Sequence, residues 1–196
     1  FLNGEIAQPC APATSIAFKR FDCITLLTRK ASGKLDIFRR TAWRPFRLLD
    51  YFDYRRGDQK DMNSLLLGSE MLVSARNVEN GHKGFYQGAK FHKRFSGNCL
   101  TLNNDGDGGV GLSFYQPHEF LLDTHVYALY PKIPLSRFAQ LFVSRTISMC
   151  RPCFSHGHSI SQSRLKTLKI MLPATADNKP DVFATSMPVS NFERVF

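Results

Sequence analysis

The pattern of apolar and polar positions predicts several short strands followed by one long helix. Apolar residues recur at helical spacing from Leu135 to Met149, and Pro134 precedes them at a position that proline favours. Upstream, short apolar runs bounded by asparagine, glycine or proline predict strands at residues 71–74, 99–102, 110–115 and 126–130. Because the strands come before the main helix instead of alternating with helices, the fold class is expected to be α+β, a compact mixed β-sheet domain with a few helices.

Three further segments carry weaker patterns. Residues 44–52 are expected to form a short helical turn that presents aromatic side chains to a core. Residues 76–88 are polar and punctuated by glycine, which predicts a loop. Residues 164–170 alternate basic and apolar side chains, which predicts a strand with one basic face.

The same patterns suggest a division of the chain. Residues 1–42 contain Pro9 and Pro12 and show no clear period, so they are expected to form a poorly defined basic appendage. The readable pattern begins at Trp43 and defines a domain over residues 43–183. Residues 184–196 are expected to be a C-terminal tail.

Composition and charge point to an anionic partner. The 196 residues include 26 Lys and Arg against 16 Asp and Glu, and 43% are hydrophobic, which is too many for a disordered basic tail. Residues 1–42 hold seven basic and three acidic residues, so the other 19 basic and 13 acidic residues give the rest of the chain a net charge of +6. The excess therefore belongs mostly to the folded domain, and nucleic acid is the usual partner of such a domain.

Cysteine usage and hydropathy suggest the compartment. Five cysteines, an odd and scattered set, do not form the disulfide framework of a small secreted fold. The sequence has no apolar run of the ~20 residues that a spanning helix needs and no secretory signal at its start. We therefore expect a cytoplasmic protein with no membrane partner.

Motifs for catalysis or cofactors are weak. Residues 106–111 match G-x-G-x-x-G, but a strand-like run follows them where a dinucleotide site needs a helix, so a glycine-rich turn is the better interpretation. Cys150, Cys153, His156 and His158 leave open a zinc-dependent interaction module, although their spacing is not that of a common zinc finger. No nucleophile elbow, metalloprotease helix or phosphate-binding loop is present, so nothing in these residues specifies an enzyme, and no cofactor is expected.

Three basic loops interleaved with hydrogen-bonding residues predict DNA binding. Arginine, asparagine and histidine can address base edges, whereas lysine mostly addresses phosphate. The predicted contacts to base edges are Arg76, Asn77, His82 and His158, with His156 in the same loop as His158. The predicted contacts to phosphates are Lys83, Lys90, Lys93, Arg94, Arg164 and Lys166.

An ordered series of short motifs carries a family resemblance over residues 43–183. The series includes Trp43, Phe46-Arg47-Leu48, Arg56-Gly57, Gly97-Asn98-Cys99-Leu100-Thr101, Phe114-Tyr115-Gln116-Pro117, Phe154-Ser155-His156-Gly157 and Ile170-Met171-Leu172-Pro173. It resembles the target-recognition domain of the specificity subunit of type I restriction–modification enzymes. Only one such domain is present, where the family's subunits carry two.

The resemblance implies a component that reads a sequence of double-stranded DNA without catalysis. Its implied partners are a methyltransferase (modification) subunit and, as a further partner, the restriction subunit. With a single recognition domain, the chain fits a half-subunit or a truncated product. The alternatives are the recognition part of a fused methyltransferase and nuclease, and the zinc-dependent interaction module.

Overall fold

The computed structural model describes residues 42–60, 65–106, 109–154 and 159–181. In this part of the chain no helix is long and apolar enough to cross a membrane. The strands are β1 (Ala42–Arg47), β2 (Phe52–Arg56), β3 (Leu67–Val73), β4 (His82–Tyr86), β5 (Cys99–Asn103), β6 (Ser113–Gln116), β7 (Leu121–Leu122), β8 (Val126–Pro131) and β9 (Lys169–Ala174). The helices are α3 (Leu48–Tyr51), α4 (Arg137–Met149) and α5 (Gln162–Thr167), with single 3-10 turns η2 (Glu79–Gly81) and η3 (Arg151–Cys153).

A four-stranded antiparallel sheet, in the order β2-β8-β5-β6, forms the centre of the fold. Its side chains alternate between two faces, as the two-residue period of a strand requires. Leu100 of β5 and Leu129 of β8 belong to the core on one face, whereas Cys99 and Ala128 belong to the core on the other. Both faces are therefore buried, which explains why these strands read as continuous apolar runs.

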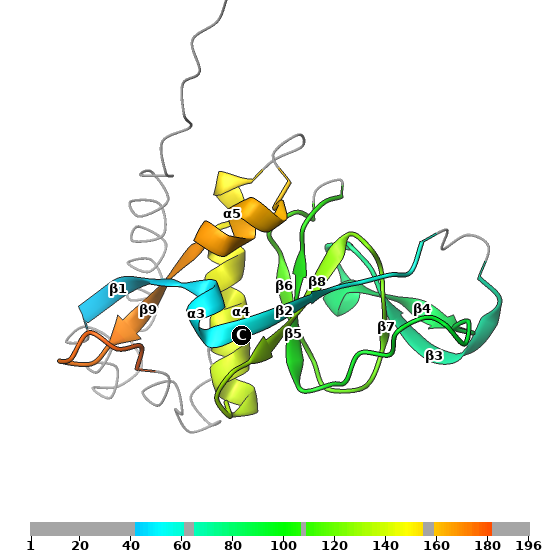
Figure 1. Ribbon diagram of the computed structural model, residues 1–196, viewed down its shortest axis with the longest axis horizontal. Helices are drawn as coiled ribbons and strands as arrows, with labels where there is room; N and C mark the ends of the chain where they lie inside the picture. Colours follow the sequence, from blue (N-terminus) through cyan, green and yellow to red (C-terminus); the bar gives the residue numbers. More distant parts are fainter. Residues whose placement is uncertain (1–41, 61–64, 107–108, 155–158, 182–196) are drawn as a thin grey trace, which may run out of the picture.

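Helix α4 packs on one face of this sheet (Figure 1). The Ser136 side chain accepts a hydrogen bond from the Ala139 amide at 3.2 Å and caps the start of the helix. Ala139, Val143 and Ile147, spaced four residues apart, are each at most 3% exposed. The helix predicted from apolar spacing is confirmed, because this stripe is the one that meets the core.

A three-stranded sheet, in the order β4-β3-β7, covers the other face, with β7 parallel to β3. The predicted strand at residues 71–74 is part of β3, but the predicted loop at residues 76–88 contains β4. The chain reverses through η2, where Asn80 and Gly81 have φ values of 52° and 79°. Strand β4 pairs with the preceding strand β3 across residues 74–81, and the polar, glycine-punctuated composition of residues 76–88 does not show this pairing.

Two other expectations about local structure hold only in part. The segment 44–52 is mostly extended, because β1 pairs antiparallel with β9 from Ala42 opposite Ala174 to Arg47 opposite Lys169, and only α3 is helical. The segment 164–170 begins as helix α5, which buries Leu165 and is capped by the Ser161 side chain. The alternation is interrupted at Thr167, so Leu165 and Leu168 lie three residues apart, which suits a helical turn.

The other three predicted strands are present, one of them with a later start. The strand at residues 99–102 is β5 and the strand at residues 126–130 is β8. The strand expected at residues 110–115 begins only at Ser113, since residues 109–111 form a turn. The expected α+β architecture, mixed sheets with few helices, is confirmed.

Candidate functional site

The first predicted loop, residues 76–83, is attached to the end of β5 by a buried amide. Asn103 is 0% exposed, and its Nδ2 donates to the Arg76 carbonyl oxygen at 2.9 Å. The Arg76 guanidinium donates to the His82 carbonyl oxygen at 2.7 Å and pairs with the Glu79 carboxylate at 3.2 Å. Asn77, at the tip of this loop, is exposed. The loop is therefore closed on itself and fixed to the central sheet.

The third predicted loop, residues 156–166, is attached to Asn104, the residue that follows Asn103. The Ile160 amide donates to the Asn104 carbonyl oxygen at 2.7 Å, and the Ile160 side chain is fully buried. Arg164 donates from Nη1 to the Ser159 carbonyl oxygen at 2.9 Å, and Lys166 is exposed on α5. Two loops that are more than seventy residues apart in sequence thus meet at Asn103 and Asn104. His156 and His158 lie outside the described residues.

Sequence reasoning missed two basic side chains at the same end of the sheet. His125 accepts the Asn104 amide on its carbonyl oxygen at 3.0 Å, and its Nδ1 lies 3.0 Å from the Asp123 carboxylate. Arg56 donates from Nε to the Thr124 carbonyl oxygen at 2.8 Å. The signal for Arg56 was the Arg56-Gly57 motif. A Cβ at Gly57 would lie 2.1 Å from the Asp123 carbonyl oxygen, so only glycine lets the chain cross this turn so closely.

We call the end of β5 at Asn103 and Asn104, where the two loops meet, the loop end. Arg56, Arg76, His125 and Arg164 form its loop-end cluster. Hydrogen bonds link each of the four, directly or through one neighbouring residue, to the β7–β8 turn or to Asn103 and Asn104. Side chains of this kind donate hydrogen bonds to phosphates and to base edges.

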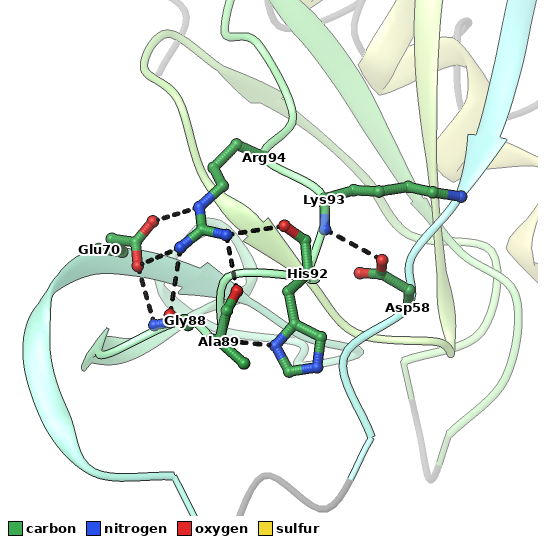
Figure 2. A network of polar contacts seen from close by, with 7 residues as sticks. All are labelled: Asp58, Glu70, Gly88, Ala89, His92, Lys93 and Arg94. Carbon is green, nitrogen blue, oxygen red and sulfur yellow. Dashed lines mark hydrogen bonds and ion pairs between the residues drawn. The ribbon is translucent and has the colours of Figure 1, made fainter.

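The second predicted loop, residues 90–94, is held by a charged brace that also includes Gly88 and Ala89, and we call residues 88–94 the braced loop (Figure 2). Arg94 donates from Nε and Nη2 to the two carboxylate oxygens of Glu70 at 2.7 and 2.9 Å, and from Nη1 and Nη2 to the carbonyl oxygens of Ala89, His92 and Gly88. A guanidinium has five N–H groups, and all five are occupied here. The hydrogen bond from Arg94 holds the pKa of the Glu70 carboxyl below its ordinary value.

This brace changes the role expected of Arg94. Because its donors are all engaged within the chain, the geometry argues against the phosphate contact predicted for it. Lys90 and Lys93 of the same loop are exposed, and only the Lys93 main-chain amide is engaged, at 3.0 Å from the Asp58 carboxylate. In Figure 2 the Lys93 side chain extends away from Asp58.

Two other predicted residues lie on β4. The His82 ring packs edge-to-face on Phe85 with centroids 5.1 Å apart, and its Nε2 is buried without a partner. In this conformation Nε2 cannot reach a base edge, which argues against that role for it. Lys83 is half-buried.

The other chemical motifs resolve differently. The glycine-rich stretch that ends at Gly111 is followed by strand β6 and not by a helix, so a dinucleotide site is contradicted. Within the described ranges no three His, Cys, Asp or Glu side chains are grouped to hold a metal ion. Cys150, one of the four candidate zinc ligands, directs its Sγ to the Thr146 carbonyl oxygen at 3.8 Å.

Comparison with known proteins decides the family. A family model for the type I restriction modification DNA specificity domain matches residues 41–183. This chain belongs to that family. The specificity-domain resemblance drawn from the ordered motifs is confirmed, and so is its extent as a single domain.

Among curated proteins, the chain is 29% identical over 140 residues to the specificity subunit S.BcgI of the type II restriction enzyme BgcI from Heyndrickxia coagulans. That match covers 69% of this chain and 39% of the relative, so the chain spans well under half of the relative's length.

Solved structures with the same fold are also specificity subunits. The HsdS subunit from Thermoanaerobacter tengcongensis has a TM-score of 0.57 and 16% identity, over 93% of this chain and 44% of that one. The type I restriction-modification S subunit from M. genitalium has a TM-score of 0.53 and 14% identity, over 94% of this chain and 51% of that one. At these identities the likeness concerns the fold.

Proposed function

We propose that this specificity domain binds double-stranded DNA and reads a base sequence, as the non-catalytic specificity component of a restriction–modification system. The observation that carries the proposal is the convergence of two predicted DNA-contacting loops on Asn103 and Asn104, within a chain of the DNA specificity family. Loops set on a rigid sheet are the usual place for residues that select a ligand.

The residues divide by chemistry. Arg76, Asn77, Arg56 and His125 have the side chains suited to base edges, and they lie at or beside the loop end. The exposed Lys90, Lys93 and Lys166, together with Lys83 and Arg164, are assigned to phosphates. Arg94 positions Lys90 and Lys93. His156 and His158 keep their predicted roles as DNA contacts.

The family membership also suggests the partner subunits of this domain and its compartment in the cell. We propose that the domain directs a methyltransferase subunit to its site and that the restriction subunit joins the same complex in the cytoplasm. A solved type I system that shares this fold, at a TM-score of 0.56 and 15% identity, is described in terms of complex assembly and conformational transition, which supports assembly as the working state. Residues 43–183 would be the DNA-reading unit, with 1–42 and 184–196 as an appendage and a tail.

A selection experiment tests the proposal. The full chain, and in parallel the chain mixed with its methyltransferase subunit, is used to enrich binders from a pool of duplexes with a randomised centre. We expect one short motif to emerge and to bind roughly 10³-fold or more tightly than unselected duplex. A pool that binds no better after selection than before, in both arms, contradicts the proposal.

Charge reversal at Lys93 tests the phosphate assignment. Lys93→Glu removes one phosphate contact, so we expect weaker binding to every duplex and a salt slope that is flatter by about one unit. Titrations by fluorescence anisotropy across a salt series measure both. The matched control is Lys179→Glu, which reverses an exposed lysine remote in sequence from the three loops. Equal slopes for Lys93→Glu and the wild type would remove this loop from the DNA surface.

The share of the relatives that the chain covers keeps one alternative open. At 39–51% of their lengths, the domain also suits the recognition part of a fused methyltransferase and nuclease. An assay of methyl transfer from S-adenosylmethionine to the selected duplex, with the chain alone and with a separately purified methyltransferase subunit added, separates the two. We expect transfer only in the mixture, and no transfer in the mixture would favour the fused enzyme.

A further inference from the structure

The tip of the braced loop carries an aromatic side chain that the DNA contacts above do not use. Phe91 is 82% exposed, whereas Phe95, four residues later, is 2% exposed and stacks on Phe120 in the core. A single exposed apolar residue is common on protein surfaces and by itself indicates nothing. The surroundings of Phe91 make it different.

The backbone that presents Phe91 is fixed from several sides. The His92 amide donates to the Ala89 carbonyl oxygen at 3.0 Å and closes a turn with Lys90 and Phe91 at its centre. The Ala89 amide donates to His92 Nδ1 at 3.3 Å, and the Arg94 brace binds the carbonyl oxygens at both ends of this turn. Figure 2 shows Ala89 and His92, the two ends of this turn, between Glu70 on one side and Asp58 on the other. The Phe91 ring itself stands edge-to-face on the His92 ring, with centroids 4.4 Å apart.

A rigid mount matters for what Phe91 can do. Ordering a flexible loop on binding costs conformational entropy, and a loop that is already ordered avoids that cost. An apolar side chain held rigidly in solvent is therefore prepared for contact with a partner.

The charges around Phe91 indicate which partner. Lys90 and Lys93 flank it and are exposed. Among the acidic groups near this loop, Glu70 is paired with Arg94, Asp58 accepts the Lys93 amide on Oδ2, and Glu119 also acts electrostatically on Arg94. An aromatic flanked by lysines is atypical of the core of a protein–protein interface, where lysine is depleted. It suits duplex DNA, where lysines bind phosphates and an apolar side chain inserts between base pairs.

We infer that Phe91 is a wedge that inserts at a base step of the bound duplex and unstacks it, while Lys90 and Lys93 hold the flanking phosphates. This inference rests on the proposed function and deepens it. The wedge adds sequence selection without hydrogen bonds to the bases, because some base steps unstack more readily than others. Pyrimidine–purine steps such as TA and CA are the most easily kinked, so we expect one of these beneath Phe91.

The experiment uses the full chain and the duplex enriched by selection, with 2-aminopurine placed at successive positions. Unstacking raises the fluorescence of this base, so the wild type is expected to give a rise at one step. Phe91→Ala is expected to abolish that rise and to weaken binding to the selected duplex by about tenfold or more. Its affinity for unselected duplex and its salt slope are expected to match the wild type, because the lysines remain. Phe91→Trp is expected to restore the rise.

Controls separate this inference from a general defect. Leu67→Ala removes an apolar side chain that is 85% exposed on β3 and is expected to bind as the wild type does. Thermal unfolding of Phe91→Ala should match the wild type, since the ring is exposed.

Three outcomes would overturn the wedge. The first is a fluorescence rise that persists in Phe91→Ala, and the second is an equal loss of affinity for selected and unselected duplex. The third is unchanged DNA binding with lost association to the methyltransferase subunit, which would make Phe91 a protein contact. If the wild type itself prefers no duplex, the proposed function fails first, and that result is read without any Phe91 variant.

Discussion

Two regions proposed to face DNA are held in place by opposite chemistry. At the loop end, an uncharged amide and main-chain groups do the holding, and Asn103 is 0% exposed. At residues 88–94, an ion pair does it, and the Glu70 and Arg94 side chains are 32% and 30% exposed. A buried neutral hydrogen bond is insensitive to salt and costly to lose, whereas a partly exposed ion pair contributes little to global stability and responds to solvent conditions. The loop end should therefore be coupled to the whole fold, and the braced loop should be able to loosen alone.

The largest expected effect comes from Asn103→Ala at the loop end. Loss of the amide leaves the Arg76 carbonyl oxygen without its donor, so the free energy of unfolding should fall by about 1–3 kcal/mol. Urea denaturation measures this change. Asn77→Ala, on the exposed tip of the loop that Asn103 holds, is the matched control and should stay within ~0.5 kcal/mol of the wild type. Similar values for the two variants would mean that the loop is not coupled to the fold through Asn103.

A smaller effect is expected from Ser161→Ala, which removes the cap of α5. The Ser161 hydroxyl accepts from the Arg164 amide at a long 3.4 Å, so the loss should lie near the low end of the capping range, about 0.5 kcal/mol. Gln162→Ala, one position further on, changes an exposed side chain without removing the cap and is the control. A thermal unfolding shift as large as that of Asn103→Ala would show that α5 supports the loop end more than its contacts indicate.

The smallest global effect is expected from Glu70→Gln, although its local effect should be the clearest. Gln cannot hold Arg94 by charge, and it cannot accept from the Gly88 amide and Arg94 as a carboxylate does. We expect the amide of Gly88 to exchange with solvent faster while unfolding in urea changes less than for Ser161→Ala. Faster exchange across the whole central sheet would contradict this separation of the two regions.

At low pH, protonation of Glu70 in the wild type should have the same effect on the brace as the Glu70→Gln substitution. Because Arg94 lowers the pKa of the Glu70 carboxyl below its ordinary value of 4.5, the brace contributes fully above that pH. Its contribution is lost as the pH falls through the lower value of the folded state. The difference in unfolding free energy between the wild type and Glu70→Gln should therefore close in acid, and a constant difference would show that the charge of Glu70 is not what holds the loop.

Local sequence patterns predicted the elements whose burial produces a clear arrangement of apolar residues along the chain. The stripe of Ala139, Val143 and Ile147 and the apolar runs of β5 and β8 are readable because both sheet faces and one helix face are buried. Strand β4 was missed because polar residues and glycines in 76–88 indicate a loop, although the segment pairs with the preceding strand β3. Helix α5 was mistaken for a strand because a stretch of six or seven residues fits both periods.

The candidate site was predictable in outline and not in arrangement. Residue types identified three basic loops. Composition could not show that all five N–H groups of Arg94 donate hydrogen bonds to other residues of the chain. Arg56 and His125 were missed because their placement depends on the close crossing of Gly57 over the β7–β8 turn. Both differences depend on contacts that folding of the chain makes, such as those of Arg94 with Glu70 and of Arg56 with Thr124.

The sequence by itself determined the family, the α+β class and a positive charge carried mostly by the folded domain. These follow from the order of short motifs, from side-chain periodicity and from residue counts, none of which needs a third dimension. Only the tertiary structure decided which basic side chains can still donate to a ligand and which loops meet. It also decided that Phe91 is exposed to solvent while Phe95 is buried. The reason is physical, because hydrogen-bond saturation and burial depend on neighbours that chain folding brings together.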